Sequence, residues 1–404
     1  MDNRILLYGA TGYSGKLIAC SAHRRMEQST QLEFVLGGRD ARALSQLAHE
    51  LDMDFIQFGL DDRARVVQVL QSFNLVINAA GPFIGTGEKL AKVAIETGTH
   101  YVDINGEVAV YKRLDDLAAA AERRNVTLVS GAGTTAAVSD VMLDVALKTI
   151  ENDIAQPELG EVRIATSRMA FFSRGSALTM LSAIREEVTI VRADRRKPDE
   201  EPRMRLTHIP VGKLERTFDF RMPNVDVKRD HDDRFGRRIG SAASLVDVLT
   251  ARHTLKRHKR VSEQITGFIE MPLLLRTGYQ LGAHSAFMFA MPWVRRLSRA
   301  QINQLPAGPD PDERRVNRHR VLLEIEDRYR QTLIDWRLQT PDPYEFTAAC
   351  VIAISANIAL GTFSKPGWQT PSAVLDYKDT DAMLGAPPFA ACDFYHREPD
   401  LVLP

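Results

Sequence analysis

Short apolar runs alternate with longer amphipathic stretches through the first 135 residues of the chain. Apolar runs bounded by turn residues are typical of strands buried on both faces, and apolar residues three or four apart are typical of helices. We therefore predict six strands alternating with five helices, the order of a Rossmann-type doubly wound parallel sheet in an α/β protein. The predicted strands are 5–8, 32–37, 54–58, 75–78, 100–103 and 126–130.

Alternating apolar and polar positions predict further strands after residue 135. A chain of 404 residues exceeds the size at which single cores stop growing, about 250–300 residues, so we expect more than one domain. Strands over 161–172, 206–210, 216–221 and 317–327, with a helix over 176–188, predict a second α+β domain that contains a mixed sheet. The predicted divisions are 1–135 for dinucleotide binding, 136–342 for the substrate and dimerisation, and 343–404 for a C-terminal helix and tail.

Three glycines with the spacing G-x-x-G-x-x-G stand between the first predicted strand and the first predicted helix. A dinucleotide pyrophosphate needs bare backbone N–H groups at the positive end of a helix, and a Cβ would hold it off. A glycine-rich turn in another kind of α/β protein is the alternative, but the position favours a dinucleotide site. The predicted contacts of this turn are Gly9, Thr11, Gly12, Tyr13, Ser14 and Gly15.

The end of the second predicted strand carries Gly38 and Arg39. A fold that prefers NAD usually has an acidic residue there to hold the ribose 2′-hydroxyl. A glycine leaves room for a 2′-phosphate and an arginine can bind it, so we predict NADP(H) as the cofactor, with NAD(H) as the alternative. We interpret Asp40 as the N-cap of the next helix. The alternative for Arg39 is a solvated side chain without a ligand.

Other candidates follow the remaining strands, because ligands of such sheets gather at the carboxyl ends of the strands. Asp61 lies where the adenine would pass, although it could only cap a helix. Asp103 and Glu107 could transfer a proton or hold a polar group, and Glu107 could instead stabilise a helix N-terminus. Small residues after the fourth strand would let the nicotinamide half approach the backbone. The further cofactor candidates are Ala80, Gly81, Pro82, Phe83 and Gly131.

Several motifs of the chain resemble those of the saccharopine dehydrogenase-like oxidoreductase family, which includes the mycobacterial trans-acting enoyl reductases. They are GATGYSG, GGRD, VINAAGPF, GTHYVDINGE and GAG, and GTHYVDINGE (98–107) is the most specific. The resemblance is strong over 1–145 and resumes at 305–310 and 370–372. At 173–176 the chain reads Ser-Arg-Gly-Ser, where the family tends to read Ser-x-Gly-Thr. The candidate substrate contacts are Gly106, Ser173, Gly175 and Ser176.

The resemblance implies an NADP(H)-dependent oxidoreductase that transfers a hydride to or from a C=C or C=N bond of an apolar, lipid-like substrate, as an enoyl reductase does. It also implies that the helix over 343–360 returns to the dinucleotide-binding domain. A saccharopine- or opine-type amino-acid dehydrogenase is the alternative enzyme. A membrane-peripheral scaffold or sensor that binds NADP(H) without turnover is the alternative of another class, since no Tyr-x-x-x-Lys dehydrogenase triad is apparent.

Charge and composition narrow the partners and the compartment. The 52 basic and 52 acidic residues balance, so we expect no nucleic-acid partner. Three widely separated cysteines and an N-terminus without a signal peptide favour the cytoplasm and no metal site. Residues 277–294 carry no charged side chain and are flanked by arginines. We therefore expect 263–300 to contact a membrane peripherally, such as the inner face of the plasma membrane, or to be buried as a channel wall or a homodimer interface.

Overall fold

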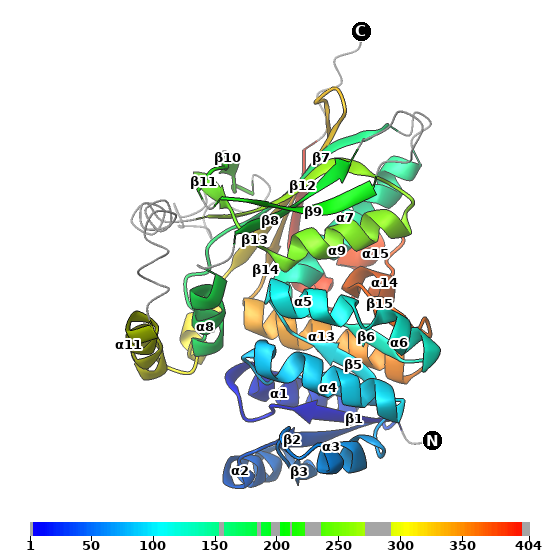
Figure 1. The fold of residues 1–404 in the computed structure, drawn as a ribbon, viewed down its shortest axis with the longest axis vertical. Coiled ribbons are helices and arrows are strands. Elements are labelled where there is room, and N and C mark those ends of the chain that lie inside the picture. Colours follow the sequence, from blue (N-terminus) through cyan, green and yellow to red (C-terminus); the bar gives the residue numbers. More distant parts are fainter. Residues whose placement is uncertain are drawn as a thin grey trace. The chain divides into compact units, whose positions relative to one another are not determined.

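The computed structural model describes residues 3–152, 157–183, 187–194, 203–210, 212–222, 236–270 and 292–397. The chain divides into two compact units (Figure 1). The first comprises Met1–Ala137 and Pro343–Asp376, and the second comprises Val138–Asp342 and Tyr377–Pro404. The first unit is therefore discontinuous in sequence, because its last segment follows the second unit along the chain.

A seven-stranded sheet, with all neighbouring strands parallel, forms the centre of the first unit. Its strand order is β15-β6-β5-β4-β1-β2-β3, so the six predicted strands and the doubly wound topology are confirmed. The seventh strand falls within 365–371, where the sequence analysis predicted no strand. The strands are β1 (Asn3–Tyr8), β2 (Leu32–Gly38), β3 (Phe55–Gln57), β4 (Leu75–Asn78), β5 (His100–Asp103), β6 (Thr127–Val129) and β15 (Gly367–Gln369).

Helices connect these strands, and two of the helices have an aspartate as the N-cap. Asp40 accepts a hydrogen bond from the Ala43 amide at 3.0 Å, and Asp62 accepts one from the Arg65 amide at 3.0 Å. The predicted N-cap role of Asp40 is thus confirmed. The helices are α1 (Tyr13–Gln28), α2 (Ala41–Leu51), α3 (Arg63–Leu70), α4 (Phe83–Thr97), α5 (Val108–Asp115), α6 (Ala118–Arg123), α13 (Pro343–Ala359) and α14 (Pro371–Leu375).

The buried helix α13 is the late segment that completes the first unit. It packs against α1 and against β1, β4 and β5. Its mostly apolar sequence has no single hydrophobic face, and most of its residues are buried, as expected of a helix enclosed on several sides.

The second unit contains a nine-stranded mixed sheet, which confirms the predicted α+β class. Strands β7 and β12 are parallel, and the other pairs are antiparallel. The order is β10-β11-β12-β7-β13-β14-β16, while β8 pairs with β12 and β9. The strands are β7 (Leu159–Thr166), β8 (Val188–Asp194), β9 (Arg203–Ile209), β10 (Glu215–Asp219), β11 (Arg237–Ala242), β12 (Ser262–Glu270), β13 (His319–Asp327), β14 (Thr332–Thr340) and β16 (Asp393–His396).

Strand β16 corrects the assignment of the whole of 343–404 to one returning segment. Residues 343–376 belong to the first unit, but Tyr377–Pro404 belong to the second. The reason is backbone pairing, since β16 adds an antiparallel strand beside β14, from Trp336↔His396 to Gln339↔Asp393.

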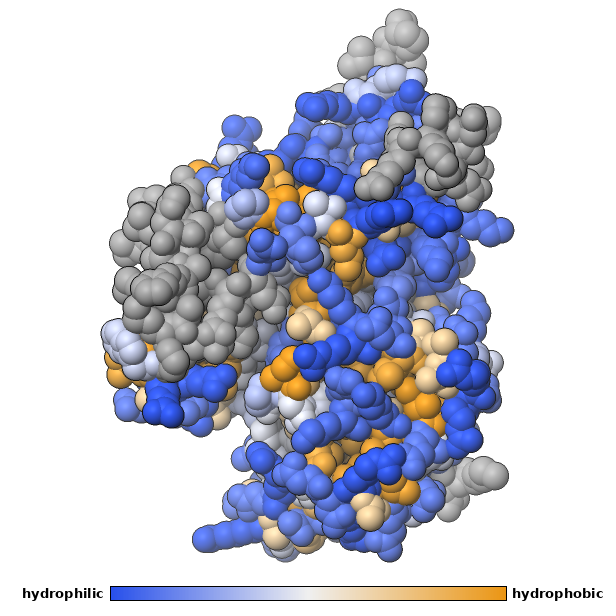
Figure 2. Space-filling model, in the orientation of Figure 1, coloured by the Kyte–Doolittle hydropathy of each residue, from blue (hydrophilic) through white to orange (hydrophobic). Residues whose placement is uncertain are grey.

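Helices and an apolar core complete the second unit. Among the residues that Figure 2 colours, hydrophilic residues cover more of the face shown than hydrophobic ones do. No helix of the described residues is long and apolar enough to cross a membrane. Most of the uncharged stretch 277–294 lies outside the described residues, which resume at 292. The helices are α7 (Thr134–Glu151), α8 (Arg174–Ala183), α9 (Val246–Arg257), α11 (Pro292–Gln304), α12 (Pro311–Val316) and α15 (Thr380–Leu384).

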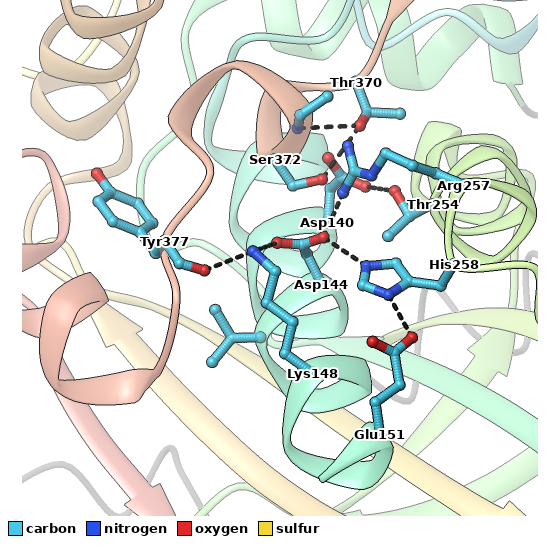
Figure 3. A network of polar contacts seen from close by, with 12 residues as sticks. Asp140, Asp144, Lys148, Glu151, Thr254, Arg257, His258, Thr370, Ser372 and Tyr377 are labelled. Atoms are coloured by element: carbon cyan, nitrogen blue, oxygen red, sulfur yellow. Dashed lines mark hydrogen bonds and ion pairs between the residues drawn. The ribbon is translucent and has the colours of Figure 1, made fainter. Parts of the chain in front are cut away.

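A network of charged side chains joins α7 to the end of α9 in the second unit (Figure 3). The Asp144 carboxylate pairs with Lys148 Nζ at 2.9 Å, with His258 Nε2 at 2.7 Å and with the Arg257 guanidinium. The other ring nitrogen of His258, Nδ1, lies 2.6 Å from Glu151 Oε1. Both nitrogens therefore face a carboxylate oxygen, which requires the ring to be a doubly protonated imidazolium when both carboxylates are charged.

The pKa values in this network follow from burial and from these partners. Burial alone would lower the pKa of His258, but the hydrogen bonds to Asp144 and Glu151 outweigh it and raise the pKa. Burial would raise the pKa of Asp144, but the hydrogen bond from His258 and the charges of Arg257 and Lys148 lower it. Asp247 of α9 is fully buried, and burial raises its pKa to about 7. A rise in pH therefore removes a proton from two groups on these helices, the imidazolium of His258 and the buried carboxyl of Asp247.

Candidate functional site

The candidate site lies where strands β1 and β4 are neighbours in the first sheet. The order of the strands reverses at this point, and ligands of doubly wound sheets bind outside the carboxyl ends of the strands there. The turn after β1 and the loop after β4 meet closely, since a Cβ on Gly9 would lie 2.7 Å from the Ala80 nitrogen. Gly9 also has a φ of +88°, which favours glycine. The structure therefore brings together the two loops that the sequence assigned to the cofactor.

The three glycines of the turn have different surroundings. A Cβ on Gly15 would lie 2.1 Å from the carbonyl oxygen of Gly9, so a side chain is excluded by the protein itself. Gly12 is exposed, and a Cβ there would meet only the Gly9 oxygen, at 3.3 Å. Gly9 and Gly15 hence shape the turn, whereas Gly12 keeps the outer side of the turn open.

Helix α1 begins at this turn without a side chain that caps it. Its N-cap is Gly12, and no side-chain cap hydrogen bond is present. A helix of 16 residues with an open N-terminus offers backbone N–H groups and a positive partial charge to an anion. The cradle therefore fits a dinucleotide pyrophosphate.

Three residues of the turn, Thr11, Tyr13 and Ser14, carry hydroxyl groups, and all three are partly exposed. The Tyr13 ring meets the Tyr344 ring of α13 edge to face, with ring centroids 5.1 Å apart and an interplanar angle of 89°. Helix α13 thus supports the turn from within the same unit, a contact that sequence reasoning missed because the two residues are far apart along the chain.

The predicted adenosine side of the site contains two charged residues, Arg39 and Asp61. Arg39 is exposed at the end of β2, and among the described residues no carboxylate forms an ion pair with its guanidinium. The Asp61 carboxyl is 97% exposed and lies 3.3 Å from Lys89 Nζ. Asp62, rather than Asp61, is the N-cap of α3. Both candidates are therefore accessible to a ligand.

Tyr8 is a residue of this region that the sequence reasoning missed. It is the last residue of β1, and its ring packs against Phe58 with centroids 5.0 Å apart. Burial raises the pKa of the Tyr8 hydroxyl, while the charge of Arg39 opposes the shift and that of Asp61 adds to it. The hydroxyl is thus electrostatically coupled to both charged candidates, and its position directly before the first glycine is the signal that could have identified it.

Gly38, which the sequence predicted to leave room for a phosphate, is buried at the end of β2. A Cβ at this position would meet the Leu44 side chain of α2 at 3.7 Å, which is ordinary van der Waals contact. A side chain at position 38 would therefore point toward α2 and pack between β2 and α2.

The loop from Ala79 to Pro82 follows β4, and Gly81 and Pro82 are exposed. The buried Asn78 side chain holds this loop, because its Oδ1 accepts a hydrogen bond from the Ala80 amide at 3.1 Å. Asn78 Nδ2 in turn donates to the Tyr101 hydroxyl at 3.1 Å. Phe83 is buried at the start of α4. The Asn78 side chain of β4 and the Tyr101 side chain of β5 consequently hold the exposed loop in place.

Asp103 is completely buried at the end of β5. Its Oδ1 accepts hydrogen bonds from the Asn105 amide at 2.9 Å, the Gly131 amide at 3.0 Å and the Ser130 hydroxyl at 2.9 Å. Its Oδ2 accepts one from the Tyr101 hydroxyl at 2.8 Å. Burial raises the pKa of Asp103, although these hydrogen bonds favour the carboxylate. Asp103 therefore ties two loops together, and its geometry does not support the proposed proton transfer.

Gly131 belongs to the same structural cluster. Its φ is +77°, and a Cβ there would lie 3.0 Å from the Ala136 side chain. Because its amide donates to Asp103, the structure gives Gly131 a role in shaping the loop after β6.

Glu107 caps the helix α4, although it precedes the different helix α5. Its two carboxylate oxygens accept hydrogen bonds from the Phe83 amide at 2.9 Å and the Ile84 amide at 3.0 Å. Of the two alternatives left open by the sequence, these contacts support stabilisation of a helix N-terminus. Gly106 beside it is exposed, with open space where a Cβ would be.

The remaining substrate candidates lie in the second unit, at the N-terminus of α8. Ser173 Oγ accepts a hydrogen bond from the Ser176 amide at 3.1 Å, so Ser173 acts as the N-cap of this helix. Gly175 is exposed. The Arg174 guanidinium donates to the Leu305 carbonyl oxygen at 2.6 Å. The motif thereby joins the start of α8 to the loop at 305–307.

The sheet order and the open glycine turn define the first unit as a dinucleotide-binding domain of the Rossmann class. Residues 5–129 match the family model described as the saccharopine dehydrogenase NADP binding domain. The resemblance inferred from the sequence motifs is therefore confirmed for this part of the chain.

Two curated relatives resemble part of the chain. The lipid droplet localized protein of Caenorhabditis elegans is 25% identical over 189 residues, which are 44% of this chain and 44% of that protein. The trans-acting enoyl reductase of Mycobacterium leprae (strain TN) is 30% identical over 118 residues, which are 28% of each chain. The matched stretches thus span less than half the length of these curated relatives.

A solved structure is similar over almost the whole chain. Apo histidine-tagged saccharopine dehydrogenase (L-Glu forming) from Saccharomyces cerevisiae aligns with a TM-score of 0.59 and 13% sequence identity, covering 98% of this chain and 100% of that chain. This likeness shows the fold, in which a Rossmann-type sheet is followed by a second mixed sheet.

Proposed function

We propose that this protein is an NADP(H)-dependent oxidoreductase. The observation that carries the proposal is the exposed, uncapped N-terminus of α1 at the point where the strand order reverses, within the stretch that matches an NADP-binding domain. The pyrophosphate would bind the turn from Gly9 to Gly15. The nicotinamide half would lie along the loop that contains Ala80 and Gly81.

The bound cofactor would supply the hydride, and the residues of this chain would bind and orient it. Arg39 would bind the 2′-phosphate, because an accessible guanidinium can donate two charge-assisted hydrogen bonds to one phosphate. Asp61 would lie beside the adenosine. Asp103 and Glu107 are engaged in hydrogen bonds within the protein, so we assign them no proton transfer.

The substrate class that we propose is an apolar, lipid-like molecule with a C=C or C=N bond. The names of the nematode and mycobacterial relatives support a lipid connection and an enoyl reduction. A substrate of the saccharopine or opine type is the second candidate, supported by the name of the yeast structure with a similar fold.

Incubation of the protein with NADPH and a panel of enoyl thioesters, imines and 2-oxo acids tests both candidates. We expect NADPH oxidation with an enoyl thioester or a lipid-like imine. Oxidation only with 2-oxo acids plus amines would support the amino-acid dehydrogenase instead. Tight NADPH binding with no turnover on any member of the panel would favour a scaffold or sensor, and absence of NADPH binding would contradict the proposal.

The helix α11 supports a further proposal, that the protein contacts an anionic membrane surface. Trp293 and Leu297 lie one helical turn apart and are 63% and 56% exposed. Arg296 and Arg299 are exposed on the same helix, and α11 contains no Asp or Glu. Exposed apolar side chains flanked by arginines suit the headgroup region of an anionic bilayer. We expect α11 to lie in that region without crossing the membrane.

Sedimentation with vesicles tests this contact. Wild-type protein should sediment with vesicles that contain phosphatidylserine more than with phosphatidylcholine vesicles, and high salt should weaken the binding. The double variant Trp293→Ser/Leu297→Ser should lose it. Tyr329→Ser is the matched control, because Tyr329 is 72% exposed but lies in the turn between β13 and β14 and not on α11. Equal binding by the double variant and the control would contradict the proposal.

A further inference from the structure

Two helices begin beside the point where the strand order reverses, and their N-termini differ in charge. The N-terminus of α1 has no side-chain cap. The N-cap of α4 is Pro82, which also has no side chain that could accept a hydrogen bond. Glu107 supplies the missing acceptor from outside the helix, with its carboxylate oxygens 2.9 and 3.0 Å from the Phe83 and Ile84 nitrogens. The N-terminus of α1 has no side-chain acceptor, whereas the N-terminus of α4 already binds the Glu107 carboxylate.

This difference bears on where the phosphates of a dinucleotide can bind. A helix N-terminus carries a partial positive charge of roughly half an elementary charge. At α4 the Glu107 carboxylate neutralises that charge and occupies two of the free amides, so a phosphate would meet a net negative group there. At α1 no side-chain cap hydrogen bond is present. Electrostatics thus favours the phosphates at α1 and leaves the α4 side for the uncharged or positively charged nicotinamide ring.

Glu107 is held in place by a chain of hydrogen bonds that ends in the core of the sheet. Its own amide donates to Asn105 Oδ1 at 2.7 Å, and the Asn105 amide donates to the buried Asp103 carboxylate at 2.9 Å. The capped residues Phe83 and Ile84 directly follow the exposed loop at Gly81 and Pro82. The position of this loop is therefore tied to β5 through one glutamate side chain.

We propose that Glu107 is a positioning residue for the nicotinamide half of the cofactor. It holds the loop after β4 in place and keeps the cofactor phosphates away from α4, so that the dinucleotide binds in one direction across the sheet. The inference rests on the proposed function, since it requires that the turn from Gly9 to Gly15 binds NADP(H).

The test compares two ligands on the variants Glu107→Ala and Glu107→Gln. NADPH contains both halves of the cofactor, whereas 2′,5′-ADP contains only the adenosine half. We expect Glu107→Ala to bind NADPH about tenfold or more weakly, which corresponds to about 1.4 kcal/mol. Its affinity for 2′,5′-ADP should change less than twofold. Glu107→Gln keeps one acceptor oxygen without the charge, and it should lie between wild type and Glu107→Ala.

Asp310→Ala is the matched control for the loss of a helix cap. Asp310 Oδ1 accepts hydrogen bonds from the Asp312 and Glu313 amides at 2.9 and 2.8 Å, so it also caps two first-turn amides with one carboxylate. We expect this variant to bind both ligands as wild type does. Faster hydrogen exchange of the Phe83 and Ile84 amides in Glu107→Ala, but not in Asp310→Ala, would show that the cap has been removed.

The possible outcomes separate this inference from the proposed function. Equal affinity of wild type and Glu107→Ala for NADPH, with the exchange of the two amides increased, would overturn the positioning role. Parallel losses of NADPH and 2′,5′-ADP would also overturn it, because they would indicate a general structural effect. Failure of the wild type to bind either ligand would instead refute the proposed function.

Discussion

Gly12 and Gly15 illustrate how one residue type serves two physical purposes within a single turn. At Gly15 a side chain would collide with the backbone of Gly9, whereas at the exposed Gly12 a Cβ would approach only the Gly9 oxygen, at 3.3 Å. Gly15 is therefore required for the fold, and Gly12 for access of a ligand to the N-terminus of α1.

Gly12→Val is expected to fold and to lose NADPH binding, because the added side chain would occupy the space outside the N-terminus of α1. Calorimetric titration with NADPH and thermal unfolding are the measurements. Gly15→Ala should instead lower the melting temperature, since the added Cβ would lie 2.1 Å from the Gly9 oxygen. A folded Gly12→Val variant with unchanged NADPH affinity would remove the turn from the site.

Arg39→Ala is expected to weaken NADPH binding roughly ten- to a hundredfold and to leave NADH binding nearly unchanged. Hydrogen bonds to charged groups contribute about 1.5–3 kcal/mol, and a tenfold change in affinity corresponds to about 1.4 kcal/mol. NADH has only a hydroxyl where NADPH has the 2′-phosphate. Titration of wild type and variant with both cofactors measures the effect. Equal losses would indicate a structural role, and a wild type that prefers NADH would contradict the cofactor assignment.

Residues whose role depends on local sequence were predictable, and residues whose partners are distant were less so. The glycine turn and the Asp40 cap involve neighbours within a few positions, so their spacing alone indicates what they do. Glu107 caps amides 24 and 23 positions earlier, and Asp103 binds the Gly131 amide 28 positions later. Spacing identified both carboxylates as important but could not show that protein amides, rather than a substrate, are their partners.

At the scale of elements, six of the seven strands of the first sheet were predicted, whereas β15 and, in the second sheet, β8, β11, β12, β14 and β16 were missed. Strand β15 has three residues and begins with Gly367, whose φ of +85° is typical of a turn. It becomes a strand only because β6 offers it an unpaired edge. Likewise, β16 is defined by its pairing with β14 and not by a pattern of its own.

The packing of α7 on α9 leads to a prediction on pH dependence. The pKa of His258 is raised in the folded protein, so its contribution to stability is present below the ordinary pKa of histidine and is lost as the pH rises through the raised value. The pKa of Asp247 is raised to about 7, so its ionisation also destabilises the folded state as the pH rises. Asp144 acts in the opposite sense, and only at acidic pH, because its pKa is lowered.

We therefore expect the free energy of unfolding to fall as the pH rises from the ordinary pKa of aspartate, about 3.9, to the raised pKa of Asp247, about 7. His258 extends the fall above the ordinary pKa of histidine, about 6.5, and the slope is at most about 1.4 kcal/mol per pH unit for each proton released. Urea unfolding at a series of pH values measures it. His258→Gln should flatten the upper part of this range, and Asp247→Asn should flatten the lower part while keeping an acceptor for the Ser139 hydroxyl, which lies 2.6 Å from Asp247. A profile that is the same in His258→Gln and wild type would show that His258 is not protonated in the folded state.

For the whole molecule, the important feature is that the chain passes between its two units three times, at 137/138, 342/343 and 376/377. The first boundary, near residue 135, was predictable from the change in pattern, and the family resemblance placed the second, at 342/343. The third passage, at 376/377, was not predicted, because β16 is defined by its pairing with β14 and not by a pattern of its own.

Two truncated chains test this division. A chain that ends at Asp376 keeps the whole first unit, so we expect it to bind NADPH like the full chain. It should unfold at a lower temperature, since it lacks β16 and the Tyr377 carbonyl that accepts a hydrogen bond from Lys148 at 2.7 Å. A chain that ends at Asp342 also lacks α13 and β15, and we expect it to lose NADPH binding. Normal NADPH binding by this shorter chain would show that 343–376 is dispensable for the first unit.

The late position of α13 has a consequence for folding during synthesis. Domains generally fold from the N-terminus as they leave the ribosome, at about 5–20 residues per second. The first unit cannot follow this order, because synthesis must advance from residue 137 to residue 376, which is 376 − 137 = 239 residues, before α13 and β15 are available. At that rate the delay is about 10–50 s. During this time the apolar surfaces of β1, β4, β5 and α1 that α13 covers remain exposed, so the nascent chain is expected to need a chaperone before it can bind its cofactor.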